Sequence, residues 1–143
     1  MDGGKCMINK TQFYSRSDGM VHYKSELPKT LQPFVNYVFS SGCYAGDDFQ
    51  SFNTKYRNAI KKMLPDGYEI HSWHKNHYEC SAVIRDFDGR FIYMRISDVR
   101  YWSNGWIDDV LIRTMKHDKD WTGGPNRYTT LFTFTEDIQK LYQ

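Results

Sequence analysis

The chain is organised around one stretch, Trp106-Ile-Asp-Asp-Val-Leu-Ile-Arg-Thr-Met-Lys-His-Asp-Lys-Asp-Trp-Thr-Gly-Gly-Pro-Asn-Arg-Tyr128. Its first half is apolar enough to form a buried strand, because Val110-Leu-Ile112 is an unbroken run. Its second half is polar from Lys116 to Asp120 and then reaches Gly123-Gly-Pro125. Glycine permits positive φ and proline fixes φ, so a turn is expected there. We therefore expect a strand that ends in a charged loop, and backbone N–H groups free at the glycines to bind an anion or a partner.

The residues before this stretch predict an antiparallel meander. Strand-like segments span 68–74, 77–87, 90–99 and 107–115, with turn signals at Lys75-Asn76, Asp88-Gly89 and Ser103-Asn-Gly105. If the first two turns have two residues each, strict alternation places one set of side chains on a single face: Tyr68, Ile70, Val83, Ile92, Met94 and Ile96. The opposite face then mixes rings with polar groups and is half-solvated, covered by the N-terminal segment or used for binding: Glu69, His71, Trp73, Tyr78, Cys80, Ala82, Ile84, Tyr93, Arg95 and Ser97.

A long amphipathic helix is predicted from Asp47 to Met63. Its apolar side chains recur at helical spacing, as Phe49, Phe52, Tyr56, Ile60 and Met63. Asp47 and Gln50 form a capping-box pattern, and Pro65-Asp-Gly67 ends the helix. This stripe is expected to cover the apolar face of the sheet, since both need burial.

The N-terminal segment is expected to be less regular than the rest of the chain, and the C-terminal segment to form a short helix. A hairpin is predicted around Ser15-Arg-Ser-Asp-Gly19, the alternative being an arm that orders only on a partner. Residues 33–39 fit a helical turn or a strand equally well. Residues 135–142 predict a short helix capped by Thr135. The expected fold is therefore one α+β domain over residues 1–143: a long helix on an antiparallel sheet of about four strands, a short C-terminal helix, and residues 1–41 as a less regular arm.

Composition limits the classes of function. The formal charge of +2 on 143 residues does not indicate a nonspecific nucleic-acid binder. No apolar run is long enough for a membrane span, and the start, Met1 to Cys6, has no apolar signal core. The odd number of cysteines, Cys6, Cys43 and Cys80, is typical of free thiols in a reducing compartment. We expect a protein of the cytoplasm with no membrane association.

One residue pattern resembles a metal site. His71, His74, His77 and Cys80 recur at every third position and are all zinc ligands. A two-residue turn at Lys75-Asn76 would place His74 opposite His77 on one side and His71 opposite Cys80 on the other. Because the four groups would then not converge, no metal and no cofactor is expected.

A second pattern resembles a hydrolase site. His117 can act as a general base, and Asp118 and Asp120 can hold a divalent metal. Alternation along an extended segment separates the histidine from both carboxylates, so no catalytic residue is assigned. A metal-dependent hydrolase stays an alternative.

Binding is the better supported class, because cations and rings are interleaved in the last third of the chain. The expected partner- or ligand-binding residues are Arg95, Arg113, Lys116, His117, Lys119, Trp121, Asn126, Arg127 and Tyr128. Rings that stack and arginines that pair with phosphate suit a nucleotide or single-stranded nucleic acid. The same residue types are the usual hot spots of protein interfaces. Several aspartates weaken the positive field and disfavour a nonspecific nucleic-acid groove.

Three motifs carry a resemblance to a known group of proteins. They are Ile96-Ser-Asp-Val-Arg100, Leu111-Ile-Arg-Thr114 and Lys116-His-Asp-Lys-Asp-Trp-Thr-Gly-Gly124. From about Gly42 to its end the chain resembles small uncharacterised proteins encoded on phages and conjugative elements of bacteria. The resemblance implies an origin in a mobile element, and hence the cytoplasm of a bacterial host cell, and it supplies no catalytic residues.

Many small proteins of such origin act against host defence, as anti-CRISPR inhibitors or as traps for immune signalling nucleotides. The resemblance therefore implies a non-catalytic protein that binds a host immune protein, most plausibly a CRISPR effector. The alternatives are a nucleotide or nucleic-acid binder and a metal-dependent hydrolase. The oligomeric state is left open.

Overall fold

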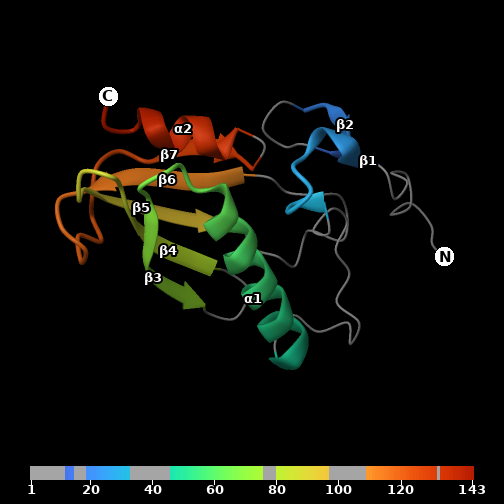
Figure 1. Ribbon diagram of the computed structural model, residues 1–143, viewed down its shortest axis with the longest axis horizontal. Helices are drawn as coiled ribbons and strands as arrows, with labels where there is room; N and C mark the ends of the chain where they lie inside the picture. The colour runs from blue at the N-terminus through green and yellow to red at the C-terminus, as the bar shows by residue number, and fades with distance from the viewer. Residues whose placement is uncertain (1–11, 15–18, 33–45, 76–79, 97–108, 132) are drawn as a thin grey trace.

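The computed structural model describes residues 12–14, 19–32, 46–75, 80–96, 109–131 and 133–143 (Figure 1). Within these ranges the side chains of Phe13, Tyr14, residues 46–51 and Asp109 are not described. Expectations for residues 33–39, the cysteines at 6 and 43, and the turn at 103–105 lie outside them. So do the predictions for His77 and Tyr78.

The fold is α+β, with one helix before a five-stranded antiparallel sheet and a short helix after it. α1 spans Gly46–Met63 and α2 spans Phe134–Lys140. The sheet strands follow one another in chain order as β3 (Glu69–Lys75), β4 (Cys80–Arg85), β5 (Phe91–Ile96), β6 (Asp109–Met115) and β7 (Arg127–Thr130). The meander was predicted, but the sheet has one strand more than the four expected.

The additional strand is β7, which we expected to belong to the loop. Arg127 pairs with Ile112 and Thr130 pairs with Asp109, so β7 extends the sheet beyond β6. Tyr128, Thr129 and Thr130 are strand-favouring residue types, and Pro125 precedes the strand without entering it. The polar loop is therefore residues 116–126, which we call the β6–β7 loop.

One predicted register is wrong by a single residue. The turn between β4 and β5 has three residues, Phe87 to Gly89, because Arg85 pairs with Phe91 and the Asp86 N–H donates to the Arg90 carbonyl at 2.8 Å. Gly89 takes φ 79°, as a three-residue hairpin loop requires. A shift of one residue exchanges the faces of a strand. Ala82 and Ile84 therefore face the core, and Val83 faces the opposite side.

The turn between β3 and β4 also differs from the prediction. Lys75 pairs with Cys80, so Lys75 belongs to β3 and does not form a two-residue turn with Asn76. Trp73 pairs with Ala82 and faces the core, where its indole donates to Asn53 Oδ1 at 2.7 Å. The Cys80 thiol donates to the same oxygen at 3.2 Å. Trp73 and Cys80 therefore lie on the core face, not on the face assigned from the sequence.

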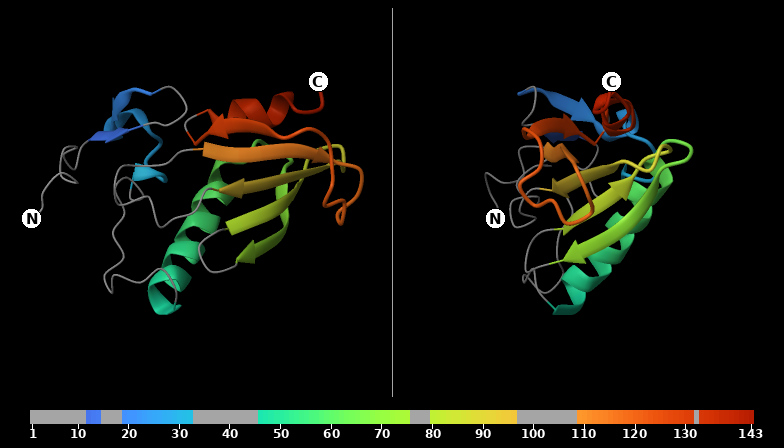
Figure 2. Two further views of the ribbon diagram at one scale, coloured as in Figure 1. Left: turned by 180° about the vertical axis from the view of Figure 1, so that it is seen from behind. Right: turned by 90° about the vertical axis from the view of Figure 1, so that its left-hand side faces the viewer.

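The predicted stripe of α1 is buried against the core face of the sheet (Figures 1 and 2). Phe52, Tyr56 and Ile60 are each 0% exposed, and the first two rings stack at 5.7 Å. Burying one such side chain stabilises the fold by about 1.5–3 kcal/mol. The helix begins at Gly46, so Asp47 lies within it. The Asp47 cap and the contact of Phe49 fall on side chains that are not described.

α2 lies along β7 and closes the end of the core (Figure 1). Its N-cap is Thr133, two residues before the predicted Thr135. The Thr135 hydroxyl instead donates to the Met63 carbonyl at 2.7 Å and joins the start of α2 to the end of α1. Ile138 and Leu141 are buried, as expected.

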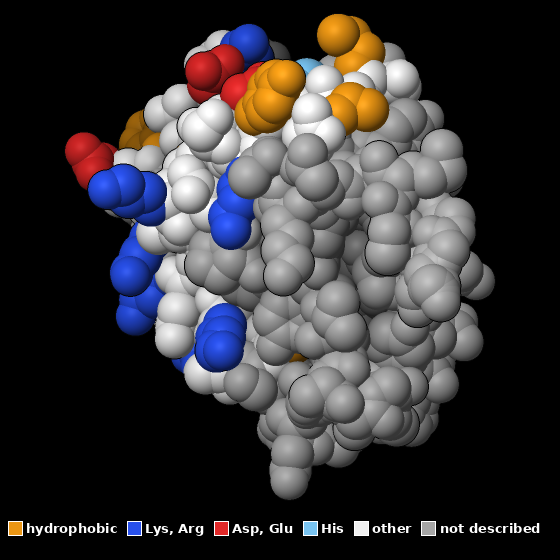
Figure 3. All heavy atoms as spheres, turned by 90° about the vertical axis from the view of Figure 1, so that its right-hand side faces the viewer, with side chains coloured by type: hydrophobic (Ala, Val, Ile, Leu, Met, Phe, Trp, Pro, Cys, Tyr) orange, Lys and Arg blue, Asp and Glu red, His pale blue; other side chains and the backbone are white. Residues whose placement is uncertain are grey.

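The predicted N-terminal hairpin is present as β1 (Gln12–Tyr14) paired with β2 (Val21–Tyr23) in a separate two-stranded sheet. Met20, Val21 and Tyr23 are exposed, and exposed apolar side chains gather at the top of the face in Figure 3. Among the described helices, neither α1 nor α2 combines the length and apolarity of a membrane span.

Candidate functional site

The β6–β7 loop folds back over the sheet on the side away from α1, which we call the outer face (Figure 2). Arg113 on β6 holds it there. The Arg113 guanidinium donates to the carbonyls of Asp120 at 3.1 Å and Trp121 at 2.9 Å. It also lies 4.5 Å from the centre of the Tyr93 ring, a cation–π contact. Arg113 is 5% exposed, so its charge is used to fix the loop.

The two glycines of the loop bring its backbone against β6. A Cβ on Gly123 would lie 1.7 Å from Arg113 Nη1 and 2.7 Å from the Thr114 carbonyl oxygen, so a side chain has no room. The Gly123 N–H donates to Asp120 Oδ1 at 3.0 Å, and the Gly124 N–H donates to the Thr114 carbonyl at 3.0 Å. The expectation that these N–H groups are free for an anion is therefore wrong.

Asp120 organises the loop from within. Its carboxylate accepts hydrogen bonds from the Lys116 N–H, the Gly123 N–H and the Thr122 hydroxyl. The Lys116 and Gly123 backbone N–H groups, in that order, are the main causes that lower the pKa of Asp120 to about 2. The conformation of the loop therefore depends on an ionised Asp120.

Asp118 and His117, the two other members of the predicted hydrolase set, also have contacts within the chain. Asp118 Oδ2 lies 3.1 Å from His71 Nε2 on β3, a half-exposed pair that joins the loop to the first strand of the sheet. His117 Nδ1 accepts the Lys119 N–H at 3.3 Å. Each of the three groups thus has a separate contact within the chain, and these contacts account for their positions without a shared ligand.

Trp121 is the side chain that the loop presents. Its ring meets His74 at 6.2 Å and Tyr93 at 6.1 Å between centres, in edge-to-face geometry in both cases. The side chain is still 56% exposed. Arg113 holds the Trp121 carbonyl and the His74 and Tyr93 rings contact its side chain, so the ring is positioned before any partner binds.

The strand register extends this surface across the sheet. His74 pairs with Ser81, Ser81 with Arg95, Arg95 with Leu111, and Leu111 with Tyr128. Residues paired across strands point to the same face, so one row on the outer face crosses all five strands. The exposed members of this row and Trp121 define the Trp121 surface: His74, Arg95, Trp121 and Tyr128.

The nine residues expected to bind a partner do not all lie together. Arg95, Trp121 and Tyr128 are exposed on the Trp121 surface, and His117, Lys119 and Asn126 are exposed on the β6–β7 loop. Arg127 is exposed too, but it pairs with Ile112 of the core and so lies on the opposite face of β7 from Tyr128. Lys116 lies where the loop leaves β6, next to a separate pocket. Arg113 is internal. The sequence did not link His74 or Tyr93 with Trp121, because these contacts join residues distant in the chain and depend on the register.

The zinc-like set is divided by the sheet. His74 lies on the outer face with Trp121, and His71 is there too because its ring contacts Phe91 at 5.1 Å. Cys80 is buried on the core face. Within the described part of the chain, no three histidine, cysteine, aspartate or glutamate residues are placed to share a metal ion.

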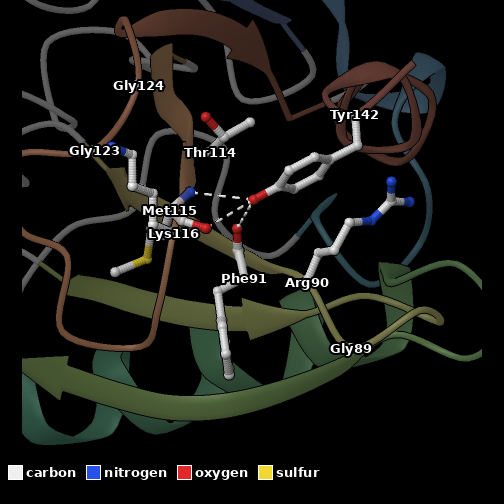
Figure 4. Close-up of a pocket in the computed structure, with 9 residues that line it drawn as sticks. All are labelled: Gly89, Arg90, Phe91, Thr114, Met115, Lys116, Gly123, Gly124 and Tyr142. Atoms are coloured by element: carbon white, nitrogen blue, oxygen red, sulfur yellow. Dashed lines mark hydrogen bonds between the residues drawn. The ribbon is translucent and has the colours of Figure 1, made fainter.

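A pocket of about 410 Å³ lies at the end of the sheet where β5 begins and β6 ends (Figure 4). The Tyr142 hydroxyl sits between these strands, where it accepts the Met115 N–H at 3.3 Å. The same hydroxyl can donate to the carbonyl of Phe91 at 2.7 Å or of Met115 at 2.9 Å. Arg90 completes the pocket on the side of the β4–β5 turn. Nothing in the sequence singled out Arg90 or Tyr142.

Comparison with known protein families, curated proteins and solved structures finds no match for the chain in any of the three. The functional argument therefore rests on the geometry and chemistry of these side chains.

Proposed function

We propose that this protein is a non-catalytic binding protein whose recognition surface is the Trp121 surface together with the flanking cation Lys119. The proposed target is a host immune protein of bacteria, with a CRISPR effector as the first candidate because of the resemblance to proteins of mobile elements. In this proposal the protein inhibits its target by occupying it.

One observation carries the proposal: an exposed Trp121 ring on a loop that is fixed from below. A tryptophan ring that served only to pack the fold would be expected to be mostly buried, whereas the Trp121 side chain is 56% exposed. Hydrogen bonds from Arg113, together with the Asp120 contacts, hold the backbone around it. A preorganised ring loses little conformational entropy on binding, which is the property of an interface hot spot.

Charge indicates what kind of surface would fit. The carboxylate of Asp118 contacts His71 of β3, and that of Asp120 accepts hydrogen bonds from the loop backbone. The Lys119 side chain is exposed and has no ion pair among the described residues. The two carboxylates keep their charge but are held in contacts within the chain, whereas this cation beside the Trp121 surface can reach a partner. An acidic, partly apolar patch on the target protein would complement it.

Affinity capture from a bacterial lysate that contains a CRISPR effector tests the proposal. The baits are the wild-type protein, Trp121→Ala with Tyr128→Ala, and the matched control Tyr23→Ala with Phe87→Ala. The control removes rings of equal exposure, since Tyr23 is 56% and Phe87 is 68% exposed against 56% and 69% for Trp121 and Tyr128. We expect the effector to be retained by the wild type and the control, lost from the Trp121 variant, and inhibited when the wild-type protein is added.

Two results would contradict the proposal. One is retention of the effector by the Trp121 variant, which would place recognition elsewhere. The other is a nucleotide that co-purifies with the wild type in the absence of any protein partner, which would favour the alternative class of nucleotide binder.

A further inference from the structure

We propose that the pocket between Arg90, Lys116 and Tyr142 binds a small ligand through an oxyanion, either a carboxylate or a phosphate. This site is separate from the Trp121 surface, since neither Trp121 nor Tyr128 lines it. Its volume of about 410 Å³ lies within the usual range of small-molecule sites.

Arg90 is held so that its terminal nitrogens remain available. Its Nε donates to Asp86 Oδ2 at 2.8 Å, and its backbone N–H donates to Asp86 Oδ1 at 2.8 Å. The guanidinium lies 4.5 Å from the centre of the Tyr142 ring and 5.7 Å from that of Phe87. Among the described residues Nη1 and Nη2 have no hydrogen-bond partner. A guanidinium fixed in this way offers the planar pair of donors that oxyanions prefer.

Lys116 supplies the surplus positive charge. Asp86 is 3% exposed and offsets the charge of Arg90, whereas the exposed ammonium of Lys116 has no acidic partner among the described residues. Its backbone is fixed, because its N–H donates to Asp120 at 2.9 Å. The pocket lining contains no carboxylate. The charged residues of the lining are thus the cations Arg90 and Lys116, and the carboxylates that accept hydrogen bonds from them, Asp86 and Asp120, are not part of it.

The walls of the pocket are rigid. The Tyr142 hydroxyl is bonded to both β5 and β6, and Figure 4 shows its ring between Thr114 and Arg90. On another side lie Gly123 and Gly124, and the second is bonded to the Thr114 carbonyl. Three segments distant in the sequence thus meet around one space: the start of β5, the end of β6 with its loop, and Tyr142. Each is fixed by contacts that do not involve a ligand.

A titration with inorganic phosphate, followed by NMR at pH 7 and constant ionic strength, tests the inference. We expect saturable shifts of the backbone amides of Arg90, Lys116 and Gly124. Lys116→Gln should weaken the binding of phosphate by about tenfold, because it removes a charge-assisted hydrogen bond to the anion. The matched control is Lys119→Gln, which removes the same charge from the same loop outside the pocket lining, and should keep the wild-type affinity.

Absence of saturable shifts would overturn the inference, and so would equal phosphate affinity in Lys116→Gln and the wild type. A parallel titration with acetate separates the two classes of ligand: tighter phosphate binding indicates a phosphoryl group, and tighter acetate binding indicates a carboxylate. Trp121→Ala should leave the titration unchanged, so failure of this inference and failure of the proposed function are distinguishable.

Discussion

Arg113 is the residue that fixes the charged β6–β7 loop against the outer face of the sheet. Its guanidinium has left water almost completely, and burial of a charge is costly unless hydrogen bonds compensate. The carbonyls of Asp120 and Trp121, with the Tyr93 ring beneath, supply that compensation. Arg113 thereby positions Trp121, and its effect on binding is indirect.

Gly123 is a position where even a methyl group should be harmful. Gly123→Ala places a Cβ against Arg113 and the Thr114 carbonyl oxygen at a φ of 41°, so the loop must move off its anchor. We expect the free energy of unfolding, measured with urea, to fall by about 1–3 kcal/mol more than in Gly19→Ala. Gly19 is the matched control, since it has a φ of 70° but no atom within 4 Å of its Cβ position. Equal losses in the two variants would show that close packing at Gly123 is unimportant.

Asp120 should make the stability of the loop depend on pH. Its pKa is about 2 in the folded protein and 3.8 for the unperturbed group, so the folded state binds the proton more weakly. The contribution of Asp120 to stability is therefore present above about pH 4 and is lost as the pH falls towards 2. Urea unfolding should show Asp120→Asn clearly less stable than the wild type at pH 5, with a smaller difference at pH 2. A difference that does not change with pH would contradict this role.

At the scale of elements, the contact between α1 and the sheet holds the core together. Phe52→Ala should lower the free energy of unfolding by about 3–5 kcal/mol, because the ring is fully buried and its loss leaves a cavity. Phe87→Ala is the control, since that ring is 68% exposed on the β4–β5 turn, and should cost no more than about 1 kcal/mol. Unchanged thermal stability of the Phe52 variant would exclude the observed packing.

The elements that could be predicted from the sequence are those with a long or repeated signal. The stripe of α1 recurs over about four turns, and β5 and β6 are long runs of apolar and β-branched residues. The register of β4 could not be predicted, since Asp88-Gly89 fits a two-residue and a three-residue turn equally well and one residue exchanges the faces. β7 has only four residues and was hidden by the polar loop before it.

The candidate site could be predicted only in part. Trp121, Tyr128 and the cations near them stand out by residue type, and the structure places Trp121 and Tyr128 on the outer face. The sequence could not show that Asp118, Asp120 and Arg113 are engaged inside the chain. The sequence also could not reveal the pocket beside Arg90 and Tyr142. That pocket depends on a cation–π contact between two residues that lie far apart in the chain.

At the scale of the whole molecule, the sheet separates a core face from the outer face, on which we propose that recognition takes place. α1 and the residues of the hydrophobic core occupy one face, and the β6–β7 loop carries rings and cations over the other. The exposed cations of α1 lie on the far side of the helix from its buried stripe: Lys55, Arg57, Lys61 and Lys62. Variants there change the net charge of the protein without touching the Trp121 surface, which makes them suitable controls.

The most direct test of the recognition surface is the dissociation constant of the captured partner for Lys119→Ala, measured by calorimetry beside the free energy of unfolding. The control is Lys61→Ala, which removes the same charge from α1. We expect the loop variant to lose about 1–3 kcal/mol of binding free energy per contact while its stability stays within about 0.5 kcal/mol of the wild type. The control should bind as the wild type does. Unchanged affinity in the loop variant, or an equal loss in both variants, would contradict recognition through the β6–β7 loop.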